Sequence, residues 1–489
     1  MTQLNVPMGL RTMAGSLSLL RRLSVWFANL SWFDLALKTA VLALSTAIVW
    51  LAWHTGAIFT PFAAIKNLPY GGFIMVAITI YTSFMMLVMI ARLILAIAYR
   101  PTPSLADADL PTVTVIIPAY NEGPDVAKSI DSIARSNYPH AKLQIIAVDD
   151  GSKDDTWYHM EAAAKRHGDI VCAVKMDING GKRQGLRVGF ALAAGDVVVT
   201  MDSDSVVEPD ALRNLVTPIA VDPRIGAVAG NVKVLNRDAG VLPRMMRASF
   251  VLAFDLTRAY QSKIRSVLCT PGAFSAYRRT AVESVLEDWV DQSWCGKPST
   301  IAEDRALSNL ILRDGHEVVF QSNAVVWTNV PVTYKQMAKM YMRWERGNLR
   351  ENLTYATFAY KPFRSRYWWH CNIEWALSCV EMVVPYLLIT ASLIYGVVNP
   401  FFMLQYLAYI VIFSAAMQLY YYAKERDSDG IYGILYSLFW FTCLWWVVPY
   451  SIITANNGKW GTRTVSASIM QPSVAGRAEA VAGNLRIAA

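Results

Sequence analysis

The sequence predicts an α/β domain with a mostly parallel sheet, inserted between two α-helical transmembrane regions. Hydrophobic residues make up 54% of the 489 residues and concentrate towards the two ends of the chain. Between these ends, strand-like and helix-like segments alternate, which is typical of a parallel sheet with helices on both faces. The apolar run Val197–Met201 leads into Asp202 and Asp204. A buried strand is therefore expected to deliver two carboxylates to the sheet edge where such folds bind ligands.

Residues 1–100 are predicted to form an interfacial helix and two membrane-spanning helices. Residues 1–33 mix arginines with Leu, Trp and Phe, which favours a helix at a membrane surface over a cleaved signal peptide. The segments 35–57 and 72–98 are long enough to cross a bilayer. Basic residues flank this pair, and the loop between the two segments has Lys66 as its one basic residue. The positive-inside rule then places the N-terminus and the following domain in the cytoplasm.

Residues 101–332 are predicted to form the α/β domain. Short apolar runs predict buried strands, and the stretches between them predict helices. The expected strands are 112–118, 143–148, 170–174, 197–201, 224–230 and 317–321, and the expected helices are 126–135, 156–166 and 183–194.

Two amphipathic stretches adjoin the membrane regions. Residues 241–264 mix apolar and basic side chains, which suits either a membrane-surface helix or packing against the domain's own core. Residues 333–353, within an interface region expected over 333–372, favour the membrane surface because a basic stripe adjoins their apolar face. The stripe consists of Lys335, Lys339, Arg343, Arg346 and Arg350.

The C-terminal transmembrane region, 373–457, contains apolar segments at 373–397, 402–423 and 431–455. Residues 458–489 follow, and from 464 onward they are small and polar, which predicts a flexible tail.

Charge and cysteine content exclude several classes of partner and site. The net charge of +8 is explained by cytoplasmic lysines and arginines near the spans. No basic run or aromatic-basic motif supports a nucleic-acid partner. The six cysteines show no CxxC or Cys/His pairing, so free thiols are expected instead of disulfides or a zinc site.

Polar clusters follow three of the predicted strands. Tyr120 and Glu122 lie after the first strand, Asp150 after the second, and Asp202 and Asp204 after the fourth. Each cluster alone is compatible with an ordinary polar turn. Because parallel strands end at the same sheet edge, the three together predict a shared nucleotide site. The two carboxylates suit Mg²⁺ or Mn²⁺ shared with phosphate oxygens.

Gly180-Gly181-Lys182-Arg183 precedes a predicted helix. Its glycines permit close backbone approach, and Lys182 and Arg183 suit phosphate, although a helix cap explains the same residues.

Six short motifs together resemble one enzyme family. They are Pro118-Ala119-Tyr120-Asn121-Glu122, Asp149-Asp150-Gly151-Ser152, Gly181-Lys182, Asp202-Ser203-Asp204, Ala302-Glu303-Asp304-Arg305 and Arg343-Trp344. Their order resembles the inverting, membrane-integrated processive family 2 glycosyltransferases, namely hyaluronan, chitin and cellulose synthases and the nodulation chitooligosaccharide synthase. The resemblance covers about residues 110–350 and extends to the flanking membrane segments, and it implies a GT-A-type, Rossmann-like domain.

The resemblance implies a role for each matched residue. Tyr120, Glu122 and Asp150 would hold uracil and ribose of a UDP-sugar, with Lys182 close to the nucleotide. Asp202 and Asp204 would bind nucleotide and metal. Asp304 would be the general base and Glu303 its neighbour, and Arg343 would help to stabilise the departing UDP. This agrees with direct displacement at an anomeric carbon, which needs a base and positive charge on the leaving group. Taken alone, Glu303-Asp304 is also explained as a charged first helical turn.

The acceptor side is implied by two further matches. Residues 270–278 are similar to a loop of chitin and hyaluronan synthases and would place Gly272 and Ser275 beside the acceptor sugar, with Trp344 as its aromatic platform. The family pattern Gln-x-x-Arg-Trp is broken here because Met340 occupies the Gln position, and Gln336 lies one helical turn earlier.

Trp460-Gly461-Thr462-Arg463 resembles a cytosolic gating loop of hyaluronan synthases, which would bring Arg463 to the donor; a membrane-interface anchor is the alternative. Three C-terminal spans would leave Trp460 outside the cell. A cytosolic Trp460 requires that 431–455 is re-entrant or that another segment is miscounted.

The expected function is therefore processive polymerisation in the plasma membrane, with the catalytic domain in the cytoplasm. UDP-GlcNAc, alone or with UDP-GlcA, would extend a hyaluronan- or chitin-like chain, and the partners would be the donor, the growing polysaccharide and the bilayer. The alternatives are a non-processive transferase acting on a lipid carrier, and a transporter or scaffold with a degenerate transferase domain.

Overall fold

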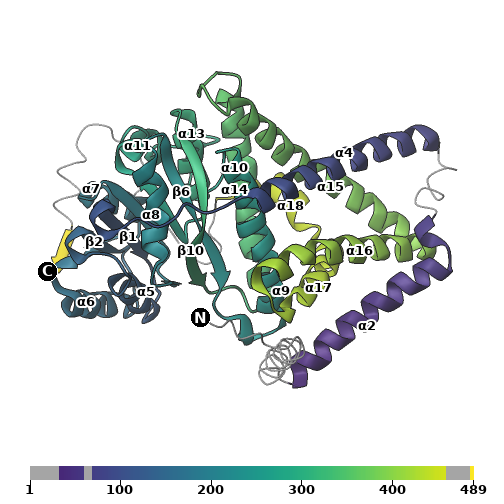
Figure 1. Ribbon diagram of the computed structural model, residues 1–489, viewed down its shortest axis with the longest axis horizontal. Coiled ribbons are helices and arrows are strands. Elements are labelled where there is room, and N and C mark those ends of the chain that lie inside the picture. Colours follow the sequence, from purple (N-terminus) through teal and green to yellow (C-terminus); the bar gives the residue numbers. More distant parts are fainter. Residues whose placement is uncertain (1–31, 60–68, 459–484, 489) are drawn as a thin grey trace, which may run out of the picture.

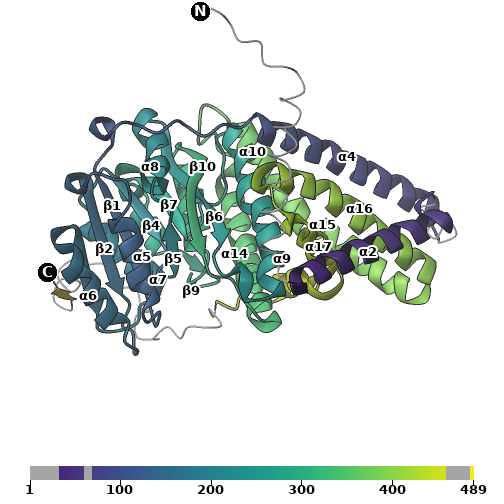
Figure 2. The same ribbon diagram turned by 60° about the horizontal axis from the view of Figure 1, so that its bottom comes forward.

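The computed structural model describes residues 32–59, 69–458 and 485–488, with an α/β domain at one end and a group of apolar helices at the other (Figure 1). The predicted helix within residues 1–33 lies almost entirely outside the described residues. The interface helices α9 (Val241–Phe250), α10 (Thr257–Lys263) and α14 (Tyr334–Ala359) lie between the sheet and the apolar helices in both views (Figure 2).

The sheet is mixed, and the predicted ligand site lies at the carboxyl ends of its parallel strands. Its order is β11-β3-β2-β1-β4-β7-β6-β10-β5. Strands β1 to β4 run parallel, whereas β7 lies antiparallel between β4 and β6. The bounds are β1 Val113–Ala119, β2 Leu143–Asp149, β3 Val171–Met176, β4 Val197–Met201, β5 Ser205–Val207, β6 Ile225–Val234, β7 Phe274–Arg278, β10 Glu317–Thr328 and β11 Leu485–Ala488. A hairpin of β8 (Ser293–Trp294) and β9 (Lys297–Pro298) forms a second sheet.

The six predicted strands are present, but residues 274–278, expected as part of a loop, form strand β7.

Alternating side chains bury both faces of the sheet. Val115 of β1 packs in one apolar cluster with Ile130 and Met160, and the adjacent Ile116 packs in another with Leu186 and Leu310. This strict alternation follows from the two-residue period of a strand. The covering helices are α5 (Asp125–Ala134), α6 (Thr156–His167) and α8 (Ala211–Val221) on the first face, and α7 (Lys182–Leu192) and α13 (Glu303–Arg313) on the second.

Four described helices are long and apolar enough to cross a membrane. They are α2 (Trp32–His54), α4 (Gly71–Ala98), α15 (Trp368–Val398) and α16 (Pro400–Glu425). A fifth span is obtained only if the pair Ser428–Leu444 and Val447–Ile453, bent by 44°, is counted as one.

Both ends of this bent segment contact elements next to the α/β domain. At its start, Asp429 pairs with Arg247 of α9 (Val241–Phe250) at 2.5 Å. Just past its end, the Ala455 carbonyl accepts a hydrogen bond from Nη2 of Arg350 at 2.6 Å, within α14 (Tyr334–Ala359). The segment therefore leaves and returns to the same side of the molecule, which is the arrangement that a re-entrant 431–455 requires.

The two amphipathic stretches form helices that pack against other parts of the chain. Residues 241–263 form one continuous helix of α9, the π-helical η6 (Val251–Leu256) and α10 (Thr257–Lys263). It contributes Phe250 and Tyr260 to the domain's clusters, so core packing accounts for this stretch. In α14, Arg346 and Arg350 are buried, and Arg346 donates to Oγ1 of Thr454 at 2.9 Å. These two members of the predicted basic stripe bind the chain itself, so they are not available to a membrane surface.

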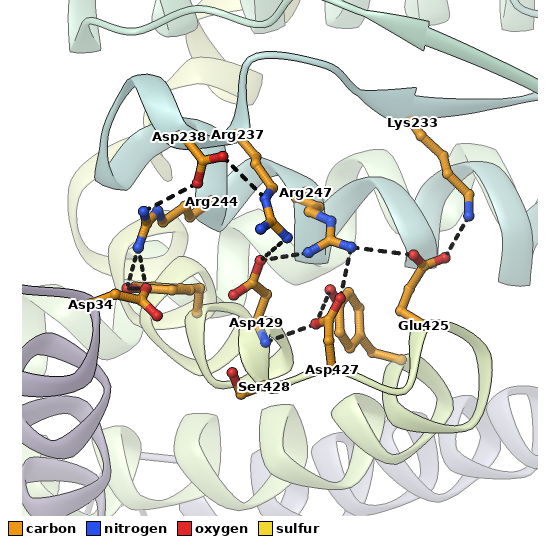
Figure 3. Close-up of polar contacts among 12 residues, drawn as sticks. Asp34, Lys233, Arg237, Asp238, Arg244, Arg247, Glu425, Asp427, Ser428 and Asp429 are labelled. Atoms are coloured by element: carbon orange, nitrogen blue, oxygen red, sulfur yellow. Dashed lines mark hydrogen bonds and ion pairs between the residues drawn. The ribbon is translucent and has the colours of Figure 1, made fainter. Parts of the chain in front are cut away.

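A network of ion pairs joins the first apolar helix, α9 and the loop after α16 (Figure 3). Asp429 accepts from Lys38 of α2 at 2.8 Å and pairs with Arg247. Arg247 also pairs with Asp427 at 2.7 Å, and Lys233 of β6 pairs with Glu425 at 2.9 Å. The buried charges have nearby partners, as burial of charge demands. The network therefore links the domain to both membrane regions.

Candidate active site

Strands β1 and β2 end level with one another and place the first two polar clusters side by side. Ala119 is in register with Asp149. Asp150 is buried, and its Oδ1 accepts a hydrogen bond from the Gly180 amide at 2.7 Å. The Glu122 amide donates to Oγ1 of Thr156 at 2.8 Å, and Tyr120 is buried beside it at the end of β1. The predicted donor residues are therefore brought together at the parallel sheet edge.

Lys182 lies at the centre of the site. It follows Gly181, whose φ of 84° permits the turn into α7. Its Nζ lies 2.6 Å from Oδ1 of Asp202 and 2.9 Å from Oε1 of Glu303. Although burial opposes the charge, these carboxylates raise the pKa of Lys182 above its ordinary value. The ammonium therefore stays charged and joins the end of β4 to the start of α13.

The side chain of the neighbouring Arg183 does not point towards Asp202 and Glu303. Its Nη1 donates to the Trp289 carbonyl at 2.6 Å, and its guanidinium also binds Gln292. The suggestion that Arg183 meets phosphate is not supported, because the side chain is buried in these structural contacts.

Glu303 and Asp304 occupy the first turn of α13, beside Lys182. Burial alone would raise the pKa of Glu303, but Lys182 lowers it to about 2. The pKa of Asp304 is raised, first by burial and then by the charge of Glu303. Oδ2 of Asp304 accepts from the Gly272 amide at 3.1 Å. Adjacent carboxyl groups thus have pKa values that are pushed apart, and the raised one suits proton transfer.

Gly272 lets Lys182 and Asp304 approach closely because it has no side chain. Ser275, three residues later, makes a structural hydrogen bond instead. A Cβ on Gly272 would lie 2.6 Å from Nζ of Lys182 and 3.6 Å from Oδ2 of Asp304. Ser275 is fully buried in β7, and its hydroxyl donates to the Pro271 carbonyl at 2.6 Å. It shapes the turn before β7 and does not present its hydroxyl to an acceptor, which differs from its expected place.

Trp344 stands against an aromatic wall formed by two interface helices. Its ring centroid lies 6.2 Å from that of Phe250, 6.4 Å from that of Phe254 and 5.5 Å from that of Tyr341. The side chain is half-buried, so the indole is fixed by its neighbours while part of it stays accessible.

Helix α14 also carries Arg343, Met340 and Gln336. Arg343 acts electrostatically on Glu303 and lowers its pKa further, so α14 brings this guanidinium near the start of α13. Met340 packs against the apolar core. Gln336 is exposed near the start of α14, where its backbone N–H donates to Oγ1 of Thr333. Gln336 therefore belongs to the helix cap and does not replace the missing Gln.

The carboxylates at the end of β4 fit a metal that is shared with a ligand. Asp202 and Asp204 supply hard oxygen donors, as Mg²⁺ and Mn²⁺ prefer. Among the described residues, no group of three or more His, Cys, Asp or Glu side chains could hold an ion by itself. A divalent cation held here would take its remaining ligands from phosphate or water.

Several contacts that define the site have no local signal in the sequence. Arg305 donates to the side chains of Asn348 and Asn352, which fixes α13 against α14. Trp289 Nε1 donates to the Glu303 carbonyl at 2.8 Å. Trp289, Asn348 and Asn352 lie outside the six motifs, and the two asparagines follow Arg305 by 43 and 47 residues.

The predicted loop Trp460–Arg463, including Arg463, lies outside the described residues. The last described residue before it, Gly458, accepts a hydrogen bond from Oγ1 of Thr300 at 2.7 Å, three residues before Glu303.

Comparisons with known proteins identify similar sequences and a similar solved structure. The family model "Glycosyltransferase like family 2" matches residues 111–347. An N-acetylglucosaminyltransferase of Mesorhizobium japonicum is 29% identical over 370 residues, covering 73% of this chain and 83% of the relative. A hyaluronan synthase of Streptococcus pyogenes is 29% identical over 365 residues, covering 72% and 83%. A solved mannosyltransferase from Pyrobaculum calidifontis, in complex with GDP-Man and Mn²⁺, has a TM-score of 0.48 and 20% identity, covering 82% of this chain and 99% of that chain.

The family match spans β1 to the Arg-Trp motif and includes every described site residue. The two relatives align over most of their length, beyond the limits of that domain. The chain is therefore a glycosyltransferase whose family 2 domain spans residues 111–347, and over most of its length it is similar to an N-acetylglucosaminyltransferase and a hyaluronan synthase.

Proposed function

We propose that this glycosyltransferase is a processive, inverting polymerase that extends a β-linked polysaccharide from UDP-sugars and moves it across the membrane. The observation that carries the proposal is the convergence at Gly272, where the end of β4, the start of α7 and the start of α13 meet. Lys182, Glu303 and Asp304 all approach this glycine, whose lack of a side chain leaves room for them.

The proposed chemistry is a single displacement at the anomeric carbon. Asp304 accepts the proton of the acceptor hydroxyl, which suits its raised pKa. Lys182 and Arg343 face the negative charge that develops on departing UDP. Asp202 and Asp204 would hold Mg²⁺ or Mn²⁺, and such an ion supplies further positive charge at the diphosphate. Tyr120, Glu122 and Asp150 would line the uracil and ribose end, as the sequence predicts. Their position at one edge of the sheet supports this assignment.

The acceptor is proposed to rest on Trp344. An indole face binds a sugar ring by apolar contact without requiring one hydroxyl pattern, so it suits a platform along which a chain advances. The wall of Phe250, Phe254 and Tyr341 holds the ring in place. Four apolar helices beside this wall supply the membrane region through which the chain would pass.

The donor is proposed to be UDP-GlcNAc, alone or with UDP-GlcA, because the relatives are an N-acetylglucosaminyltransferase and a hyaluronan synthase. The test is UDP release by the purified protein with Mn²⁺ or Mg²⁺ and each UDP-sugar, singly and in pairs. We expect release with UDP-GlcNAc and a product that linkage-specific hydrolases digest. A lipid-linked monosaccharide would support the non-processive alternative, and no UDP release from any common UDP-sugar would support a degenerate domain.

We also propose a plasma-membrane location with the domain in the cytoplasm. Helices α2, α4, α15 and α16 then form two hairpins, and the bent segment 428–453 does not cross. This puts residue 464 on the cytoplasmic side. In a background with Cys295 and Cys443 replaced by serine, a cysteine at Thr464 should react with an impermeant maleimide only after the cells are opened. Labelling in intact cells would refute this topology.

A further inference from the structure

Helix α14 comes very close to the start of α13. A Cβ added to Gly347 of α14 would lie 2.6 Å from the Cβ of Ala302, the residue directly before Glu303. Ala302 begins α13 from a left-handed conformation with a φ of 58°, which is uncommon for alanine. Trp344 lies three residues before Gly347 on α14. The proposed acceptor platform and the proposed base, Asp304, therefore belong to two helices whose backbones meet beside them.

A single guanidinium joins the two helices at this point. Arg305, two residues after Glu303, is buried. Its Nη1 donates to Oδ1 of Asn348, and its Nη2 donates to Oδ1 of Asn352 at 2.6 Å. Residues four apart share one face of a helix, so the two asparagines continue the face that carries Trp344. An arginine presents its donors in a rigid planar fork, and the two hydrogen bonds therefore fix α14 along its axis relative to α13.

Packing alone does not explain an arginine at this position. Among the residues that the structure describes, the Arg305 guanidinium binds amide oxygens and forms no ion pair. Its Nε is buried without a hydrogen-bond partner. Burying a charge that lacks an acidic partner is costly, and an apolar side chain of similar volume would fill the same space at lower cost. The two hydrogen bonds to α14 are what an apolar side chain would not supply.

A second buried connection ties the same two helices to α7. Oε2 of Glu351 on α14 accepts from Nδ2 of Asn309 on α13 at 2.9 Å, and its Oε1 accepts from Nε2 of Gln292 at 2.8 Å. Gln292 in turn accepts from Arg183, the residue after Lys182, at 3.1 Å. The side chain of Arg183 thus takes part in holding α7, α13 and α14 together.

We propose that Arg305 is a positioning residue of polymerisation, which through Asn348 and Asn352 holds the acceptor platform on α14 in register with the base on α13. A slip of α14 by one turn would move Trp344 by about 5.4 Å. A misplacement of about 1 Å is already enough to cost about 10²-fold in rate. Hydrogen bonds are directional, so they fix a register that apolar contacts leave loose. This inference rests on the proposed function, because that function gives Asp304 and Trp344 their roles.

The test measures the length of the polysaccharide that the purified protein in lipid nanodiscs makes from UDP-GlcNAc, alone and with UDP-GlcA, while little donor is consumed. Asn348→Ala removes one acceptor of Arg305, and Arg305→Lys keeps the charge but removes the fork. Both should shorten the mean product at least about fivefold, because misplacement slows elongation relative to chain release. Their UDP affinity should stay close to that of the wild type. Arg313→Lys, at the far end of the same helix where the arginine pairs with Asp288, should leave product length unchanged.

Product length separates positioning from a purely structural contribution. A smaller number of folded molecules makes less polymer, but each of them still makes chains of the same length. Wild-type product length in Asn348→Ala and Arg305→Lys, at whatever total activity, would overturn the inference while polymerisation itself stands. If Arg305→Lys does not fold, Asn348→Ala decides alone by the same criterion. Absence of polymer from the wild type with every UDP-sugar would refute the proposed function, and the role of Arg305 with it.

Discussion

The ammonium nitrogen of Lys182 lies 2.6 Å from Oδ1 of Asp202, where the start of α7 meets the end of β4. The same nitrogen lies 2.9 Å from Glu303 at the start of α13. One buried cation therefore holds together two acidic motifs that belong to different parts of the sheet edge.

Replacing Lys182 with methionine should destabilise the domain and weaken UDP binding. Asp202 and Glu303 would lose their shared cation, and removing one partner from a buried ion pair costs about 3–5 kcal/mol. Lys182→Arg, which keeps the charge, should retain most of the stability. Thermal unfolding and titration with UDP measure the two effects. Wild-type stability and UDP affinity in the methionine variant would show that the pairing is unimportant.

Asp304→Asn should abolish turnover while UDP binding survives. A positioned general base contributes about 10²–10⁴-fold to rate, and asparagine cannot accept the acceptor proton. The carboxylate does not contact the predicted uracil end, so nucleotide affinity should change little. Initial rates of UDP release measure the loss of turnover, and a UDP titration measures the retained nucleotide binding. Normal activity would refute the assignment of Asp304 as the base.

Glu303→Gln should move the acid limb of the pH profile of kcat/KM to lower pH. A base works when deprotonated, so activity is lost as pH falls through the pKa of Asp304. The negative charge of Glu303 contributes to raising that pKa. Removing this charge lowers the pKa, and residual activity should persist in more acidic solution. An acid limb that stays in place or moves to higher pH would contradict the electrostatic coupling.

Gly272→Ala should reduce turnover without unfolding the domain. The added Cβ would lie 2.6 Å from Nζ of Lys182, the mobile end of a long side chain. Lys182 can yield at small cost in stability by moving its ammonium slightly, which lengthens its contacts with Asp202 and Glu303 without breaking them. We expect an activity loss of at least about tenfold, equivalent to 1.4 kcal/mol of barrier, with a melting temperature close to that of the wild type. Full activity would show that the position of Lys182 is not critical.

Asp429→Asn should loosen the domain from the membrane helices. The substitution removes the buried carboxylate that pairs with both Lys38 and Arg247. Figure 3 shows its pair with Arg247. A cost of about 3 kcal/mol is typical when a buried charge loses its partner. Asp238→Asn, in the exposed part of the same network, should cost about 0–1 kcal/mol. Thermal unfolding in detergent compares them, and equal effects would indicate that burial does not matter here.

The parallel part of the fold could be predicted because its signals are local. Each apolar run that ends at Ala119, Asp149 or Met201 is a strand, and the polar residues beyond them meet at one edge. Strand β7 was not predicted, since Phe274–Arg278 follows a Thr-Pro-Gly turn and runs antiparallel, which an alternation of strands and helices does not anticipate.

Long-range pairing limited the prediction of the site. Arg346 and Arg350 lie on a helical face that suits a membrane surface, but their partners Thr454 and Ala455 are contributed by a segment about a hundred residues later. Likewise, nothing near Lys182 in the sequence indicates its contact with Glu303. Residue type and spacing predicted which side chains meet at the site. Which of them form ion pairs and hydrogen bonds with one another depends on tertiary packing.

The most direct test of a processive polymerase is the length of the product when only a small fraction of UDP-GlcNAc has been consumed. Gel filtration of radiolabelled product from the purified protein would resolve it. A processive enzyme gives long chains from the first time points, because each enzyme molecule extends one chain many times before it starts another. Products that begin as single-sugar adducts on lipid, or that lengthen in step across the whole population, would contradict the account.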